Sequence, residues 1–157
     1  MHKIFLTEQE VSIINGADAV VKEFGGFPSM ENGRIHRLMM SGCGYGCCSV
    51  TIVFDVMGWA DVSSRYTDIP KPAHKFLQLN FSQVRKVYMG DLKFDNPGEI
   101  KFGNTLDRSK MHQDIHPSCP VVVERPFCTF YMRSGSDFVI EFSEEECWIE
   151  ASFADAE

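Results

Sequence analysis

Residues 15–35, with the sequence NGADAVVKEFGGFPSMENGRI, contain the clearest local pattern in the chain, and they decide the fold that we expect. Apolar residues recur at positions i, i+3, i+4 and i+7 within residues 17–24, which predicts a short amphipathic helix. Asn15 is expected to cap the start of this helix, and Gly25 suits the position after its end. Because Pro28 cannot continue a helix, the chain is expected to turn there into a strand.

Two packing predictions follow from this stretch. We expect residues 25–29 to form an ordered connector with Phe27 packed beneath it, because the proline restricts the backbone on both sides. Phe24 closes the apolar stripe of the helix, and Phe54 lies in the middle of a strand pattern. Both rings are therefore expected to be buried in one cluster.

Most of the remaining sequence is typical of β-strands joined by turns. The clearest strand covers residues 48–57, where apolar residues alternate with polar ones. Residues 58–73 are expected to be a loop, and most of 95–120 is irregular. The other expected strands cover residues 35–40, 75–81, 99–102, 121–132, 137–142 and 147–153, and the apolar pattern after residue 81 continues to about Phe94.

The last three of these strands are expected to form consecutive hairpins, joined by SGSD and by SEEE. One strong helix and strands in hairpin order predict an α+β fold. In it, one N-terminal helix packs on a predominantly antiparallel sheet of about seven strands. A length of 157 residues fits a single domain that spans residues 1–157.

Composition excludes several classes of protein. No apolar run reaches 18 residues, so no membrane-spanning helix is expected. The apolar segment at the N-terminus is too short for a signal peptide, and we therefore expect a cytoplasmic protein. Six cysteines in 157 residues are too sparse for a disulfide scaffold and are interpreted as reduced thiols. A pI near 5.2 argues against nucleic-acid binding.

Acidic residues gather at the C-terminal end. Residues 134–157 carry eight acids and no base, whereas residues 1–133 carry 14 acids and 15 bases. These acids alternate with apolar residues, which indicates a structured surface able to attract a basic partner. A solubilising edge and tail is the simpler interpretation. The residues that we expect to contact a partner are Asp137, Glu141, Glu144, Glu145 and Glu146.

The sequence contains no convincing catalytic or metal site. His112, His116 and Cys119 have the residue types of a zinc site, but Pro117 disfavours a helix before it and no second ligand pair completes the set. The glycine-rich turn with Cys43, Cys47 and Cys48 lacks an adjacent base that would generate a thiolate. We therefore expect a protein that is not an enzyme and binds no metal or cofactor.

The opening stretch resembles the immunity protein 50 family, bacterial proteins thought to neutralise the toxins of polymorphic toxin systems. In that family an Asn-Gly or Asn-Ala pair opens a helix that closes on Phe-Gly, and a segment like Pro-Ser-Phe-His-Asp leads into the first strand. The residues that match here are Asn15, Gly16, 17–24, Gly25, Phe27, Pro28 and Ser29. Met30, Glu31 and Asn32 depart from the Phe-His-Asp of the family, so no functional residue is transferred to them.

Two other segments resemble this family more weakly. They are residues 77–84, with the sequence LQLNFSQV, and the closing strands at 138–142 and 147–151. The resemblance implies a protein that binds a cognate toxin and occludes its active site. The partner is then a protein toxin, expected to have a basic surface, while the oligomeric state stays open. The alternative is a β domain that binds a small molecule or lipid in the apolar interior of its sheet.

Overall fold

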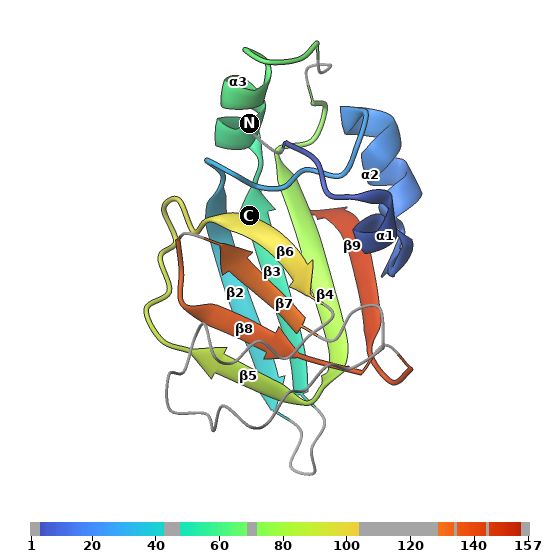
Figure 1. The fold of residues 1–157 in the computed structure, drawn as a ribbon, viewed down its shortest axis with the longest axis vertical. Coiled ribbons are helices and arrows are strands. Elements are labelled where there is room, and N and C mark those ends of the chain that lie inside the picture. The colour runs from blue at the N-terminus through green and yellow to red at the C-terminus, as the bar shows by residue number, and fades with distance from the viewer. Residues whose placement is uncertain are drawn as a thin grey trace, which may run out of the picture.

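Nine strands in two sheets, with three helices, make up the part of the chain that the structure describes, residues 4–42, 48–68, 72–103, 129–133, 135–143 and 145–154 (Figure 1). The structure is a computed structural model. The helices are α1 (Glu8–Ser12), α2 (Ala17–Phe24) and α3 (Met57–Ser63). The strands are β1 (Ile14–Asn15), β2 (Arg34–Gly42), β3 (Cys48–Asp55), β4 (Phe76–Val84), β5 (Lys86–Met89), β6 (Glu99–Gly103), β7 (Thr129–Arg133), β8 (Phe138–Glu141) and β9 (Trp148–Ala154).

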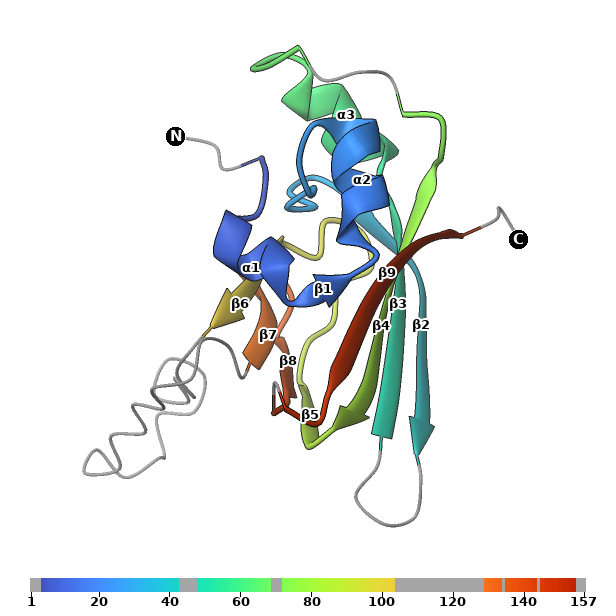
Figure 2. The same ribbon diagram turned by 90° about the vertical axis from the view of Figure 1, so that its right-hand side faces the viewer.

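The strands divide between a five-stranded sheet, in the order β1-β9-β4-β3-β2, and a four-stranded sheet, in the order β5-β8-β7-β6. All neighbours pair antiparallel except β1 and β9, which are parallel. Figure 2 shows the four-stranded sheet on one face of the five-stranded sheet, with α1 and α2 on the same side. The predicted α+β, mainly antiparallel class is confirmed, but the single sheet of about seven strands is wrong.

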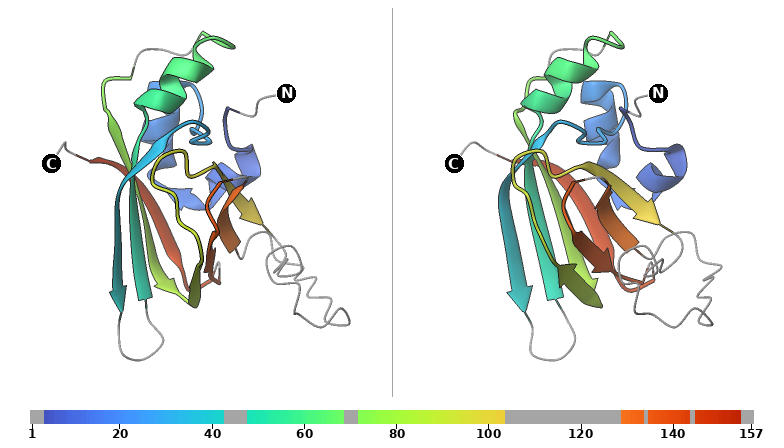
Figure 3. Two further views of the ribbon diagram at one scale, coloured as in Figure 1. Left: turned by 90° about the vertical axis from the view of Figure 1, so that its left-hand side faces the viewer. Right: turned by 60° about the vertical axis from the view of Figure 1, so that its left-hand side comes forward.

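Of the two hairpins predicted at the end of the chain, the structure contains the first and not the second. The SGSD connection joins β7 to β8, which pair antiparallel as predicted. The SEEE connection instead carries the chain from β8 in one sheet to β9 in the other (Figure 3), so the second hairpin is wrong. Alternation shows which face of a strand is buried, but it carries no information about the neighbouring strand.

Aromatic side chains fill the space between the sheets. Phe81 on β4 lies 4.9 Å from Phe130 on β7, and Phe130 lies 5.2 Å from Phe102 on β6, measured between ring centroids. Phe24 and Phe54 belong to the same buried cluster and are fully inaccessible, which confirms the predicted packing. Phe81, Phe102 and Phe130 join the two sheets by apolar burial, and in the described part of the chain no strand of one sheet pairs with a strand of the other.

The start of α2 differs from the sequence prediction. Asn15 belongs to β1 and does not cap the helix; its side-chain NH₂ donates to the carbonyl of Ile149 at 3.1 Å. Gly16 occupies the N-cap position in the left-handed conformation, with φ of 79°. At the other end, Gly25 ends the helix in the left-handed conformation and donates to the carbonyl of Val21, as predicted.

The connector after α2 is ordered, with Phe27 buried beneath it as predicted. The N–H of Leu6 donates to the carbonyl of Phe27, and the N–H of Ser29 donates to that of Ile4, each at 2.9 Å. The carbonyl of Ser29 in turn accepts from the N–H of Ile100 on β6 at 2.8 Å. The connector therefore joins the N-terminal segment to the edge of the four-stranded sheet.

Two helices were absent from the prediction. α1 begins with a capping box, in which Thr7 accepts from the N–H of Glu10 and Glu10 accepts from the N–H of Thr7. The Thr-x-x-Glu spacing is the signal that would have revealed it. α3 lies where a loop was predicted; it buries Trp59, whose Nε1–H donates to the carbonyl of Ile4 at 3.0 Å. Its seven residues contain too few turns for a clear helical period.

Candidate functional site

The crossing from β8 to β9 separates the acidic residues that the sequence placed on one hairpin. Glu145 and Glu146 are exposed on this connection, while Asp137 and Glu141 are half-buried at opposite ends of β8. Glu144 lies outside the described residues. Asp137 also exchanges backbone hydrogen bonds with Gly90 and Asp91, far along the strand from the connection. The structure therefore does not gather the four described residues of this set into one surface.

Basic residues lie near Glu141. Lys86 on β5 stands directly across the ladder from Glu141, and the N–H of Arg85 donates to the Glu141 carbonyl at 2.9 Å. Opposite charges on facing strand positions attract one another. The acidic balance of residues 134–157 is thus partly offset at Glu141 by residues distant in the sequence.

The connection places an exposed tryptophan beside acids. Trp148 begins β9 and is 55% exposed, the second most exposed of the large hydrophobic side chains in the described part. Its indole Nε1–H donates to Glu150 Oε2 at 3.3 Å, and its backbone carbonyl accepts from Ser82 Oγ at 3.1 Å. The ring lies on the face of the five-stranded sheet that the other sheet leaves uncovered. Trp148, Glu145, Glu146 and Glu150 are called the tryptophan surface below.

Trp148 is one of the apolar residues of the strand expected at residues 147–153. The signal that it points outward is its phase, because Trp148 alternates with buried Ile149 and shares the phase of exposed Glu150.

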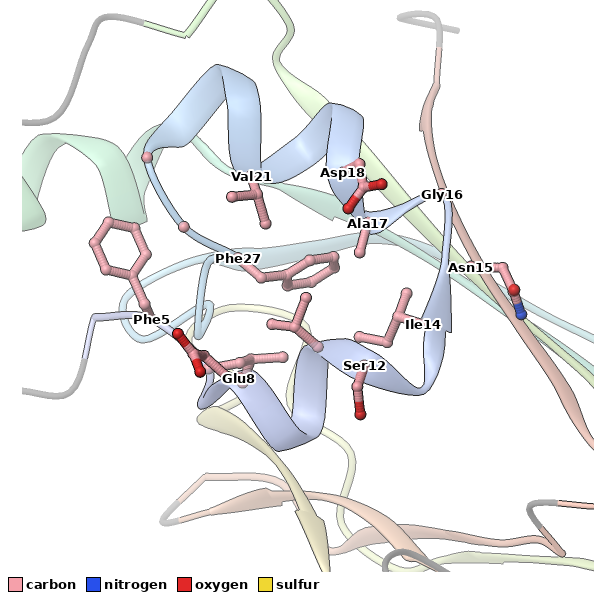
Figure 4. Close-up of a pocket in the computed structure, with 14 residues that line it drawn as sticks. Phe5, Glu8, Ser12, Ile14, Asn15, Gly16, Ala17, Asp18, Val21 and Phe27 are labelled. Atoms are coloured by element: carbon pink, nitrogen blue, oxygen red, sulfur yellow. The ribbon is translucent and has the colours of Figure 1, made fainter.

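A second feature is a groove of about 640 Å³ between α1 and α2 (Figure 4). Val21, Ile14 and Phe27 point into it, whereas Asn15 points away toward β9. Glu8 and Asp18 are the charged residues of its lining, which contains no base. Its size is within the range of small-molecule pockets, and its chemistry suits an apolar group that carries a positive charge.

The Cys147 thiol does not have the low pKa of a nucleophile. Burial raises the pKa of Cys147 to about 12, and a backbone hydrogen bond with Ser82 opposes this shift only in part. Cys48 is half-buried and free. Cys43, Cys47, His112, His116 and Cys119 lie outside the described residues. Within the described ranges, no three His, Cys, Asp or Glu side chains come together as metal ligands.

No helix in the described ranges is long and apolar enough to cross a membrane. Comparison of the chain with protein-family models, with curated proteins and with solved structures finds no match. The resemblance to the immunity protein 50 family therefore stays a prediction.

Proposed function

We propose that this chain is an immunity protein that binds a cognate toxin of a bacterial polymorphic toxin system and occludes its active site. The resemblance of residues 15–29 and 77–84 to that family supports the role. In this role the protein acts by binding, without turnover, in the cytoplasm of the cell that makes the toxin. The observation that carries the proposal is the exposed, acid-flanked Trp148.

A tryptophan is an effective anchor for a protein partner. Its large ring can bury apolar area in a complex while the indole N–H keeps a polar contact. Tryptophan is also among the residues most enriched where alanine substitution strongly weakens binding. The Trp148 ring is already oriented by its contact with Glu150, so less side-chain freedom is lost on binding.

The charge around Trp148 selects the kind of partner. Glu145, Glu146 and Glu150 are all exposed, and each would attract a basic surface. Such a surface is expected for toxins that act on nucleic acids, because these enzymes must bind phosphate. We therefore centre the partner site on the tryptophan surface, retaining Glu145 and Glu146 from the prediction and giving Asp137 and Glu141 a lesser part.

Growth rescue tests this role. The chain is co-expressed with the product of the neighbouring gene, and growth is compared with cells that express that product alone. Wild type should restore growth, and Trp148→Ala should lower the affinity for the purified toxin domain at least tenfold, about 1.4 kcal/mol or more.

The matched control is Tyr66→Ala. Tyr66 is 57% exposed and follows α3, which lies at the opposite end of the molecule from the start of β9 (Figure 1). The control should bind as wild type does. Failure to rescue growth would contradict the immunity role, whereas equal affinities of the two variants would contradict only the site.

The groove supports a second candidate function, binding of a small apolar ligand. The interior between the sheets, where the sequence suggested a pocket, is occupied by the rings of Phe81, Phe102 and Phe130. A titration with octylamine and with octanoate, followed by NMR of the Val11 and Val21 methyl groups, tests this role. Since Glu8 and Asp18 favour a cation, only the amine should shift these signals, and Val21→Trp should abolish the shift. Unchanged spectra with both compounds would exclude this function.

A further inference from the structure

Strand β2 forms an open edge of the five-stranded sheet. On its outer side its start contacts another described segment: Arg34 bridges Asp95, and the N–H of Ile35 donates to the Phe94 carbonyl at 2.8 Å. From Arg37 to Gly42, the described structure pairs β2 with β3 alone. A bulge between Ile35 and Arg37 separates the two parts. The free part is six residues long, about 20 Å of extended strand.

Strand β6, an edge of the four-stranded sheet, is hydrogen-bonded to other segments. Its Ile100 N–H donates to the Ser29 carbonyl, and its Phe102 N–H donates to the buried carboxylate of Glu10 at 3.0 Å. The connector and α1 thus pair two amide donors of that edge. Exposed edge strands readily pair with another chain, and proteins commonly cover or charge them. Among the described residues, no segment pairs with the outer side of the second half of β2.

The side chains of this half favour contact with a protein. Met39 and Met40 are 44% and 46% exposed, although they point to opposite faces of the sheet. The last charged residue of β2 is Arg37, so residues 38–42 (LMMSG) present only apolar and small side chains. Methionine adapts its shape easily to a partner surface.

We propose that a second copy of this chain pairs antiparallel with β2 and joins the two five-stranded sheets edge to edge. With the two-fold axis at Met40, Met40 faces its own copy, Met39 faces Ser41 and Leu38 faces Gly42. In this register residues 38–42 of the two copies face one another, and no like charges are opposed there, because each Arg37 lies just before this segment. Such a pairing closes after two copies, since each edge is used by the other.

Charge opposes a second copy less at this edge than elsewhere. The chain carries a net charge of −7, so two copies repel one another over most of their surfaces. β2 contains Arg34, His36 and Arg37 and no acid, which lowers this repulsion locally. A contact confined to residues 38–42 of each copy is smaller than a standard interface of about 1,600 Å². The dimer is therefore expected to be weak and to depend on concentration.

Sedimentation velocity over a dilution series tests the dimer. Wild type should shift from the mass of one chain toward that of two as concentration rises. M39K/M40K should stay monomeric, because lysines of both copies would face one another across the axis. The matched control is M89K on β5, an edge strand of the other sheet whose methionine is 42% exposed; it should dimerise as wild type does. Circular dichroism checks that each variant is folded.

Hydrogen exchange provides a second measurement that needs no variant. Protection of amides in residues 38–42 should increase with concentration, while protection at the β5 edge should not. A wild type that remains monomeric throughout the series, or equal effects of M39K/M40K and M89K, would overturn the proposal. This inference goes beyond the proposed function: E145K/E146K should leave the dimer intact, so failure of toxin binding and failure of dimerisation are separate results.

Discussion

Phe24 is a fully buried ring at the end of α2, and it packs edge-to-face on Trp59 of α3 with ring centroids 5.5 Å apart. Phe24→Ala should lower the free energy of unfolding by about 3–5 kcal/mol, because the substitution leaves a cavity in a packed interior. Urea denaturation measures this loss. The matched control is Phe94→Ala at an exposed ring, which should change stability by about 0.5 kcal/mol or less. Similar losses for the two variants would contradict the packing described here.

Cys147 predicts how stability depends on high pH. Burial raises its pKa from 9.0 to about 12, so between these values the unfolded chain loses the thiol proton while the folded chain keeps it. The stabilising contribution of this thiol is full below pH 9.0 and decreases as pH rises toward about 12. Chemical denaturation across this range should show a smaller decrease in stability for Cys147→Ala than for wild type. An identical decrease would mean that the thiol is ionised in the folded protein.

At the scale of elements, the two glycines that flank α2 have similar backbones but different surroundings. Both have φ near 80°. A Cβ at Gly16 would lie 2.5 Å from the carbonyl oxygen of Ala151 on β9, whereas a Cβ at Gly25 would meet no atom within 4 Å. Gly25→Ala should therefore lower the free energy of unfolding by about 1–2 kcal/mol, the cost of placing an alanine in the left-handed conformation. Gly16→Ala should lower the free energy of unfolding by more, because the backbone of β9 must also move to admit the added Cβ.

Thermal and urea unfolding of the two variants measure this difference. It isolates the contact between the start of α2 and β9, since the conformational cost is common to both substitutions. If Gly25→Ala is as destabilising as Gly16→Ala, the close approach of Gly16 to β9 does not add to the destabilisation.

The helices also show what short-range pattern can predict. α2 was found from its apolar stripe and its C-terminal glycine, which are local signals. α1 and α3 have five and seven residues, too few for a period to be visible. Hydrogen bonds with residues distant in the sequence stabilise them: Glu10 accepts from the N–H of Phe102, and Trp59 donates to the carbonyl of Ile4.

At the scale of the whole molecule, the acidic charge predicts a salt-sensitive association with a basic toxin. E145K/E146K should slow association about tenfold or more at low salt, and high salt should reduce the difference from wild type. The matched control is E8K/D18K, which changes the net charge equally but at the α1–α2 groove. Stopped-flow kinetics measures the rates. If both variants slow association equally, net charge acts without a localised site; if neither does, the acids are only solubilising.

The sequence by itself determined the features that arise between near neighbours. These are the α2 helix, the ordered connector at residues 25–29, the β7–β8 hairpin and the burial of Phe24 and Phe54. Each follows from apolar spacing or from backbone restriction within a few residues.

Only the tertiary structure decided which strands are neighbours. It divided the strands between two sheets, placed Lys86 opposite Glu141, left Trp148 exposed beside Glu150, and left the second half of β2 without an outer partner in the described part of the chain. Strand pairing depends on how the apolar faces of the whole chain are buried together, and alternation within one strand contains no information about the strand beside it.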